Sequence, residues 1–430
     1  MNAVFLAAAL IAFVVAGYRQ ITAIPTPDAT TPMDLLGLAM IDAAKGSVTL
    51  AIGLIGVMAL FLGLMKVAEA GGLLAIIAKT VRPLMVRLFP EVPADHPAMG
   101  AMIMNISANV LGLGNAATPF GIRAMQELDK LNPHKGTASN AMVMFLAINT
   151  SSVTLLPTGV IALRASAGSA DPAGILPTTL FATICSTIVA ITAVKFYQRF
   201  TAPAETYTSD VQAATEETVT GREMLPPEPS EPYPVWISVT ALAVVVALIP
   251  ITILYGRDIA PWIIPGLMMT LLGFGALRGV RIYEVFVEGA KDGFNVALRI
   301  IPYLVAILVA VAMLRSSGAL ELLITPLGAL TSLFGLPPEA LPMALLRPLS
   351  GSGAYGVMAS IMQEPTTGPD TYVGYLVSTL QGSTETTFYV LAVYFGAVQI
   401  RRIRHALAAA LTADIAGIAA AVAITAYLFG

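Results

Sequence analysis

The sequence predicts an all-α polytopic membrane protein made of two inverted-topology repeats with broken or re-entrant helices. Three observations lead to this fold class. First, 57% of the 430 residues are hydrophobic and only 11% are charged, which is typical of helical membrane proteins. Second, apolar runs long enough to span a bilayer recur along the chain. Third, four apolar runs are interrupted by glycine, amide and hydroxyl residues, and these interruptions occur in the same order in both halves.

The charged and metal-binding residue types exclude several classes of function. A net charge of −3 gives no reason to expect a nucleic-acid partner. Cys185 is the single cysteine, and the three histidines do not pair at metal-ligand spacing, so we expect no metal site. The sequence contains neither a Ser–His–Asp arrangement in an apolar run nor a Gly-x-x-x-x-Gly-Lys-Ser/Thr loop. We therefore expect neither an enzyme nor an ATP-driven pump, and no cofactor beyond an H⁺ or Na⁺ coupling ion.

The first half of the chain is expected to begin with a retained transmembrane helix over residues 3–18. No basic segment precedes this run, and Gly17-Tyr18-Arg19 is a poor cleavage site for a signal peptidase. The elements expected next are an amphipathic piece ending near Lys45, a span at 48–65, an interfacial helix at 73–89, interrupted runs at 99–120 and 138–163, and a span at 175–196.

Residues 201–234 are predicted to be a solvated linker between the halves. They hold seven acidic residues, one arginine and six prolines, a composition that cannot bury an apolar core. The elements expected after the linker are spans at 235–254 and 262–277, an amphipathic segment at 278–295, apolar runs at 297–314 and 319–334, interrupted runs at 341–362 and 372–398, and a last span at 406–428.

An internal repeat with inverted topology follows from the order of these features and from charge. Gly71-Gly72 corresponds to Ser317-Gly318, residues 105–118 to 347–355, and residues 149–154 to 381–386. Basic residues at 195–199, 278–281 and 401–404 place these edges and the linker in the cytoplasm. Three spans between the two repeat cores would then invert the second core, which is the usual architecture of secondary transporters.

Polar residues inside the interrupted runs of the first half are candidate binding groups. Amides both donate and accept hydrogen bonds, which suits a ribose, a heterocycle edge or an amino-acid group, but amides and hydroxyls also bridge membrane helices. The hydroxyls of the second run suit cation coordination or helix capping equally. The candidates are Asn105, Ser107, Asn109, Asn115 and Thr118 in the first run, and Asn149, Ser151 and Ser152 in the second.

Arg347, Ser350, Ser352 and Tyr355 are the corresponding candidates in the first interrupted run of the second half. Arg347 is predicted either to bind an anionic group of a substrate or to pair with Glu385. The serines lie beside glycines and resemble a helix start whose N–H groups attract anions. The Gly-Ser-Gly pattern also permits close helix packing, so both interpretations remain open.

Glu385 indicates a site more strongly than any other residue. It lies between two apolar runs, where a carboxylate at the bilayer centre costs roughly 3 kcal/mol. An interrupted helix at that depth survives only where it lines a cavity or packs in protein. We therefore expect a substrate or ion site between two half-helices; the alternative is a hairpin that emerges into the headgroups with Glu385 solvated. The other candidates in this stretch are Gln381, Ser383, Thr384 and Thr386.

These motifs resemble those of a known family. Residues 105–119, Asn-Ile-Ser-Ala-Asn-Val-Leu-Gly-Leu-Gly-Asn-Ala-Ala-Thr-Pro, resemble spore maturation protein A. Residues 347–353, Arg-Pro-Leu-Ser-Gly-Ser-Gly, and 382–389, Gly-Ser-Thr-Glu-Thr-Thr-Phe-Tyr, resemble spore maturation protein B. The chain looks like the two fused in order, with an A-like Gate repeat over 1–200, the linker over 201–234 and a B-like Gate repeat over 235–430. Both belong to the Gate, or nucleoside-recognition, group, which also supplies membrane parts of concentrative nucleoside transporters and of the bacterial ferrous-iron transporter.

The resemblance implies a Gate-type transporter fold and a multi-pass protein of the bacterial inner (cytoplasmic) membrane. With the polar residues at membrane depth, it predicts an ion- or proton-coupled secondary transporter of a small polar metabolite, nucleoside-like or amino-acid-like. The alternatives are an accessory or structural membrane protein of envelope or spore maturation that keeps a transporter fold, and an ion-conducting pore. The expected partners are a small-molecule or ion substrate and the lipid bilayer, and a homo-oligomer is compatible with the sequence. Asn109, Asn149, Arg347 and Glu385 are predicted to surround one shared cavity.

Overall fold

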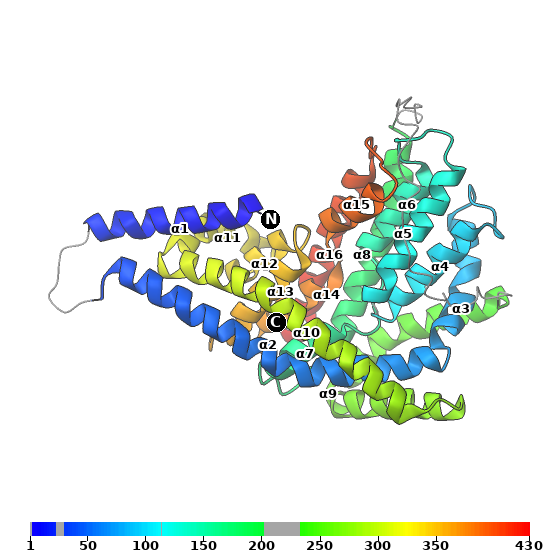
Figure 1. The fold of residues 1–430 in the computed structure, drawn as a ribbon, viewed down its shortest axis with the longest axis horizontal. Coiled ribbons are helices and arrows are strands. Elements are labelled where there is room, and N and C mark those ends of the chain that lie inside the picture. The colour runs from blue at the N-terminus through cyan, green and yellow to red at the C-terminus, as the bar shows by residue number, and fades with distance from the viewer. Residues whose placement is uncertain (1, 23–29, 113, 202–232) are drawn as a thin grey trace.

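The protein is a multi-pass membrane protein, and the part of the chain that the structure describes is helical. The computed structural model describes residues 2–22, 30–112, 114–201 and 233–430, and every regular element in this part of the chain is a helix (Figure 1). Four of its helices are long and apolar enough to cross a membrane, or five if the bent pair Leu304–Ser316 and Ala319–Gly328 counts as one span. The four are Phe5–Thr22, Pro32–Ala70, Leu176–Gln198 and Ala406–Phe429. The predicted linker lies outside the described residues except at its ends, 201 and 233–234.

The first half confirms the predicted interruptions. Its helices are α1 (Asn2–Thr22), α2 (Pro32–Ala70), α3 (Leu73–Leu88), α4 (Pro97–Val110), α5 (Gly114–Leu131), α6 (Asn140–Thr150), α7 (Thr158–Ser166) and α8 (Leu176–Gln198). Gly112 lies in the break between α4 and α5 with a φ of 77°, a conformation that side chains with a Cβ rarely adopt. A Cβ at Gly112 would also overlap the carbonyl oxygen of Leu156, so this glycine lets the α4–α5 break approach the α6–α7 break closely.

The second half is also broken twice where the sequence predicts it. Its helices are α9 (Val235–Leu277), α10 (Ile282–Ser316), α11 (Ala319–Thr331), α12 (Leu341–Leu346), α13 (Gly351–Gln363), α14 (Tyr372–Ser383), α15 (Thr387–Gly396) and α16 (Ala406–Phe429), with 3-10 turns η1 (Ser332–Phe334) and η2 (Pro338–Ala340). The breaks lie at 347–350 and 384–386. Gly318 before α11 is left-handed with a φ of 75°, as is Gly72 before α3 with a φ of 86°, so the two positions matched by sequence share one backbone conformation.

Three predicted boundaries between elements are wrong. The spans expected at 235–254 and 262–277 are one helix, α9, and the segments expected at 278–295 and 297–314 are one helix, α10. The amphipathic piece ending near Lys45 likewise continues through the next span as α2. A change from an amphipathic to an apolar surface alters what a helix packs against, but it does not end the backbone hydrogen bonding. Among the described residues, α8 and α9 are the two helices between α7 and α10, so inversion of the second half cannot rest on a count of three spans.

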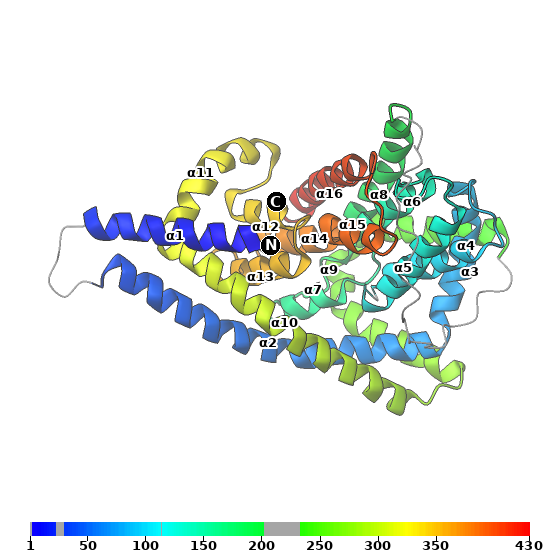
Figure 2. The same ribbon diagram turned by 45° about the horizontal axis from the view of Figure 1, so that its top comes forward.

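Helices α2 and α10 pack against each other in opposite directions (Figure 2). A Cβ at Gly63 of α2 would lie 2.8 Å from the ring of Phe286, and a Cβ at Gly293 of α10 would lie 2.6 Å from the Cα of Ala59. Rising residue numbers along α2 therefore meet falling numbers along α10. Because glycine has no side chain, the two backbones approach each other closely at Gly63 and Gly293, as they do at small residues between other membrane helices.

The two halves exchange their short half-helices. The buried apolar cluster around α4, α5 and α6 contains Tyr394 and Phe395 of α15, whereas the cluster around α12, α13 and α14 contains Ile161 and Leu163 of α7. Helix α8 packs along α16, where the Ser186 Oγ donates a hydrogen bond of 2.9 Å to the carbonyl oxygen of Ala413. The apolar core of each half therefore includes a half-helix from the other half.

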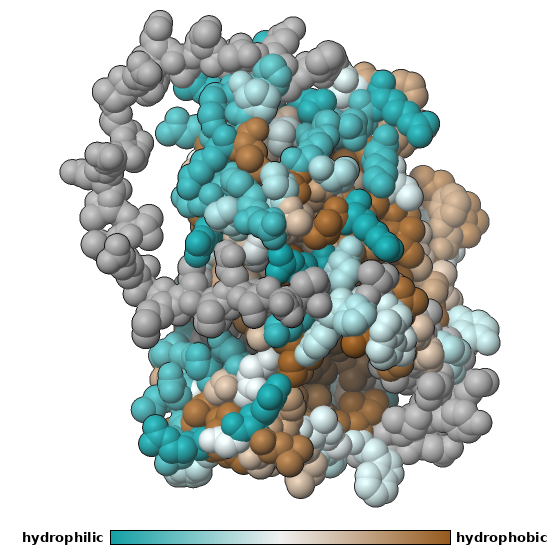
Figure 3. Space-filling model, turned by 90° about the vertical axis from the view of Figure 1, so that its right-hand side faces the viewer, coloured by the Kyte–Doolittle hydropathy of each residue, from teal (hydrophilic) through white to brown (hydrophobic). Residues whose placement is uncertain are grey.

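Two pairs of loops also join the halves. Arg164, at the end of α7, is fully buried and donates to Asp370 at 3.1 Å and to the carbonyl oxygen of Pro369 at 2.6 Å, in the loop before α14. The backbone N–H groups of Arg401 and Arg402, before α16, donate to the carbonyl oxygen of Gly136, before α6. On the face shown in Figure 3, hydrophilic residues gather in the upper part and hydrophobic residues show along one side.

Candidate functional site

All four helix breaks meet at one cavity of about 240 Å³. Each break contributes side chains or backbone to its wall. The lining residues are Asn109 and Gly112 from the α4–α5 break, Thr154 and residues 156–160 from the α6–α7 break, Arg347, Gly351 and Tyr355 from the α12–α13 break, and Gln381, Gly382, Glu385 and Thr386 from the α14–α15 break. Broken membrane helices expose backbone groups that a solute or ion can bind.

The two breaks of the first half are joined by an amide pair. The Asn109 Nδ2 donates to the Asn149 Oδ1 at 2.9 Å, and the Asn149 Nδ2 donates to the carbonyl oxygen of Phe145 at 2.9 Å. The backbone N–H of Leu155 donates to the carbonyl oxygen of Val110 at 2.9 Å. Asn149 is buried behind Asn109, so it positions a wall residue and does not line the cavity itself.

Arg347 holds the two breaks of the second half together. Its Nη1 donates to the Thr386 Oγ1 at 3.0 Å, and its Nη2 donates to the carbonyl oxygen of Thr384. The same Nη2 lies 3.6 Å from the Glu385 Oε2. The Arg347 side chain is only 6% exposed, whereas that of Glu385 is 50% exposed. Arg347 therefore satisfies polar groups left free where α14 ends, and Glu385 presents its carboxylate to the cavity.

The breaks of the two halves also touch each other directly. The backbone N–H of Glu385 donates to the carbonyl oxygen of Thr150 at 2.8 Å. The Tyr355 hydroxyl donates to the carbonyl oxygen of Gly159. The cavity therefore lies between the halves, and a relative movement of the halves would change its shape.

Several predicted residues are present near the site but use their polar atoms within their own elements. Hydroxyls that donate to a carbonyl one turn earlier in the same helix are satisfied without a ligand, as are side chains that cap a helix. Ser107, Ser151 and Ser383 donate in this way to the carbonyl oxygens of Ile103, Ala147 and Leu380, and the Ser350 Oγ caps α13 by accepting from the N–H of Gly353 at 3.0 Å.

Five further predicted residues with described side chains lie away from the cavity wall. The Asn105 Nδ2 donates to the carbonyl oxygen of Ala117 at 2.8 Å and to the Tyr394 hydroxyl at 3.1 Å. Thr384 contributes its carbonyl oxygen to Arg347, and Ser152 lines a separate apolar cavity. Thr118 and Ser352 are partly buried and do not line the 240 Å³ cavity, and the side chain of Asn115 lies outside the described residues.

A family model for nucleoside recognition, named Gate, matches residues 51–167 and 297–401. The chain belongs to the Gate family. It is 48% identical to spore maturation protein A of Bacillus subtilis (strain 168) over 153 residues, and this aligned region covers 36% of this chain and 78% of that protein. It is 46% identical to spore maturation protein B of the same organism over 167 residues, and this aligned region covers 39% of this chain and 93% of that protein. No solved structure matches the chain.

The two segments matched by the Gate model contain all four helix breaks. Helices α8 and α16 lie outside the matched segments, although both pack against the half-helices. The resemblance noted in the sequence is therefore confirmed for the motifs that form the cavity.

Sequence reasoning missed two residues of this Gate protein that support the site. Tyr394 of α15 donates to the Asn149 Oδ1 at 3.3 Å and so connects the second half to the amide pair of the first. Asp414 of α16 is 2% exposed and accepts a hydrogen bond of 2.7 Å from the Thr387 Oγ1. Asp414 is an acid inside an apolar span, which is a signal of function in membrane proteins.

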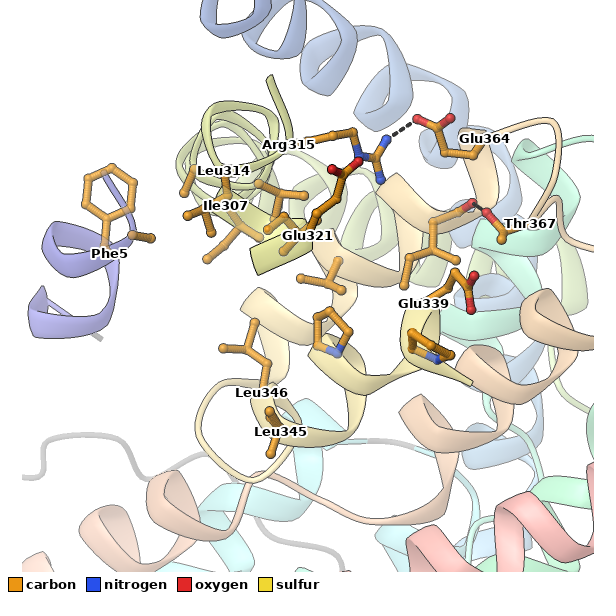
Figure 4. Close-up of a pocket in the computed structure, with 18 of the residues that line it drawn as sticks. Phe5, Ile307, Leu314, Arg315, Glu321, Glu339, Leu345, Leu346, Glu364 and Thr367 are labelled. Carbon is orange, nitrogen blue, oxygen red and sulfur yellow. Dashed lines mark hydrogen bonds and ion pairs between the residues drawn. The ribbon is translucent and has the colours of Figure 1, made fainter. Parts of the chain in front are cut away.

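A second cavity of about 670 Å³ lies between α1, α10, α11, α12 and α13 (Figure 4). Its wall is mainly apolar, with Leu314 and Ile307 on one side, and Arg315 pairs with Glu364 at its edge. None of the predicted polar residues whose side chains the structure describes lines it. The predicted polar residues that line a cavity gather at the smaller one between the halves, so that cavity is the candidate site.

Proposed function

We propose that this Gate protein is an ion- or proton-coupled secondary transporter of a small polar metabolite in the bacterial inner membrane. The observation that carries the proposal is the cavity built by four helix breaks from both halves, with Glu385 half exposed in it and Arg347 buried behind it. Binding sites of secondary transporters are formed by broken helices where two repeats meet. A purely structural membrane protein gains nothing from a charged, hollow centre, because ionised groups are costly there.

We further propose that the halves are inverted repeats, and the reciprocal contacts support this. A two-fold axis makes every contact occur twice with its partners exchanged. Helix α2 packs on α10 and α8 on α16, each against the helix at the same place in the other half. The exchange of α7 and α15 between the two apolar clusters is reciprocal in the same way. The antiparallel course of α2 and α10 supports inversion where the span count does not.

The chemistry of the wall favours a small solute with both donors and acceptors. A guanidinium, a carboxylate, two amides and several hydroxyls and carbonyls surround about 240 Å³. This volume lies below the roughly 300 Å³ at which pockets for drug-sized ligands begin. An amino-acid-like solute therefore fits this conformation more readily than a nucleoside does.

A thermal-shift screen of the purified full-length protein against nucleosides, amino acids and dicarboxylates tests the proposal. A ligand that binds the folded state raises the melting temperature, and above its dissociation constant the stabilisation grows with the logarithm of its concentration. We expect a stabilising solute whose effect is lost in Asn109→Ala and Glu385→Gln. Glu339→Gln, which changes an exposed acid at the other cavity, is the matched control. If no solute stabilises the protein, or the site variants respond as the control does, the accessory role suggested by the names of the two relatives becomes the better account.

A further inference from the structure

Asp414 is a buried acid whose carboxylate is only half satisfied. It lies in α16, within a helix able to span a membrane, and is 2% exposed. The Thr387 Oγ1 donates to the Asp414 Oδ2 at 2.7 Å, while the Oδ1 has no hydrogen-bond partner among the described residues. An ionised carboxylate in such a place costs several kcal/mol unless a partner or a proton neutralises it.

Asp414 lies directly behind the break that carries Glu385. Thr387, its hydrogen-bond partner, is the first residue of α15 and follows the break at 384–386. One turn after Asp414, a Cβ at Gly417 would lie 2.7 Å from the Thr384 Cγ2, so α16 packs tightly on the same break. Asp414 is therefore connected to the cavity wall through its hydrogen bond to Thr387, which directly follows the wall residue Thr386.

Arg347 and Asp414 contact consecutive parts of the same break. Arg347 donates to Thr384 and Thr386 and lies 3.6 Å from Glu385, while Asp414 accepts a hydrogen bond from Thr387. The helices packed on α16 are α6, α8, α14 and α15. Of their titratable groups, the Tyr197 hydroxyl of α8 lies 3.1 Å from the Thr412 hydroxyl of α16. The charged group that contacts the break beside Asp414 is Arg347, through Thr386, the neighbour of Thr387. With both acids ionised, the triad Glu385–Arg347–Asp414 carries one net negative charge.

We propose that Asp414 is the proton-binding group of the transporter and that its proton exchanges with a cationic group of the solute at Glu385. When Asp414 is ionised, Arg347 is shared between two acids, and the cavity-facing Glu385 carboxylate attracts the ammonium group of a solute that carries a net positive charge. When the Asp414 Oδ1 takes up a proton, Arg347 neutralises Glu385 alone, and the cationic solute is released. One proton gained accompanies one positive charge lost, so the net charge of the triad with its ligand is unchanged. This inference rests on the proposed transport function and names its coupling residue and solute class.

Infrared difference spectroscopy tests the proton site without any solute. The full-length protein in lipid nanodiscs is titrated with acid, and the carbonyl stretching band of a protonated carboxylic acid is followed in H₂O and D₂O. We expect a band that grows on acidification, is lost in Asp414→Asn and is unchanged in Glu339→Gln. Thr387→Val keeps the acid but removes its hydrogen bond, so it should shift the frequency of the band. A band that persists in Asp414→Asn and is unmoved in Thr387→Val would overturn the assignment.

Calorimetric titration with lysine and with norleucine tests the exchange. The two probes share backbone charges and chain length, but lysine carries an additional ammonium group. If one proton leaves for each lysine bound, the apparent affinity for lysine rises by about tenfold per pH unit below the infrared midpoint and levels off above it. Norleucine should lack this dependence, and Asp414→Asn should abolish it for lysine. A pH-independent lysine affinity, or a dependence on Na⁺ concentration in its place, overturns the exchange. If neither lysine nor any solute of the thermal-shift screen binds while the infrared band is intact, the proposed transport function is overturned and the assignment of the proton site to Asp414 is retained.

Discussion

Removal of the Arg347 guanidinium should destabilise this Gate protein far more than removal of the Glu385 charge. Arg347 is buried and donates to the Thr384 carbonyl and the Thr386 hydroxyl. Hydrogen bonds from a charged group contribute about 1.5–3 kcal/mol each, and breaking a buried ion pair costs about 3–5 kcal/mol. We therefore expect Arg347→Met to lower the free energy of unfolding by about 4 kcal/mol.

Glu385→Gln should cost much less. The Glu385 carboxylate is half exposed and lies 3.6 Å from Arg347, and exposed pairs of this kind contribute about 0–1 kcal/mol. In the variant, Arg347 keeps its bonds to Thr384 and Thr386. The double variant Arg347→Met/Glu385→Gln should not recover the loss, because the orphaned Thr384 carbonyl and the unpaired Asp414 are still buried.

Chemical unfolding of the purified variants in detergent, followed by circular dichroism, measures these differences. Arg315→Met is the matched control, because Arg315 and Glu364 form an ion pair whose side chains are 43% and 45% exposed, and its loss should cost about 0–1 kcal/mol. The reasoning would be refuted if Glu385→Gln destabilised the protein as much as Arg347→Met does, or if the double variant regained wild-type stability.

Three further predictions address the fold. Burial and the neighbouring arginine lower the pKa of His405, in the loop before α16, to about 4. Because the pKa of histidine in the unfolded chain is about 6.5, this contribution to stability should be complete above pH 6.5 and should fall as the pH drops towards 4. His405→Leu should flatten this part of a profile of melting temperature against pH. Gly293→Ala should destabilise by about 1–3 kcal/mol because the new Cβ meets the α2 backbone, whereas Gly273→Ala, which meets nothing within 4 Å, should not, as denaturant titration would show. Single-cysteine labelling in intact cells should place residues 166–172 and 401–404 on opposite sides of the membrane, and labelling of both from one side would contradict the inverted repeats.

The sequence by itself determined the membrane class, the family and the positions of the helix breaks. Composition decides the class because a bilayer admits only helices rich in apolar residues or closed barrels. The breaks are local: Gly112 adopts a backbone conformation suited to glycine, and Ser350 caps the helix that follows it. Such signals are readable along the chain because they depend on a few adjacent residues.

Only the tertiary structure decided which polar residues face the cavity. Ser383 and Glu385 are two residues apart, yet Ser383 bonds within its helix while Glu385 lines the wall. The direction of a side chain depends on how each half-helix is rotated against its neighbours, and that rotation is set by packing between halves. The position of Asp414 against Thr387 has the same origin, because residues distant in the chain meet only once α16 packs on the α14–α15 break. The continuity of α9 was likewise not readable, because Gly256, Asp258 and Pro261 interrupt its apolar sequence with residue types typical of a turn.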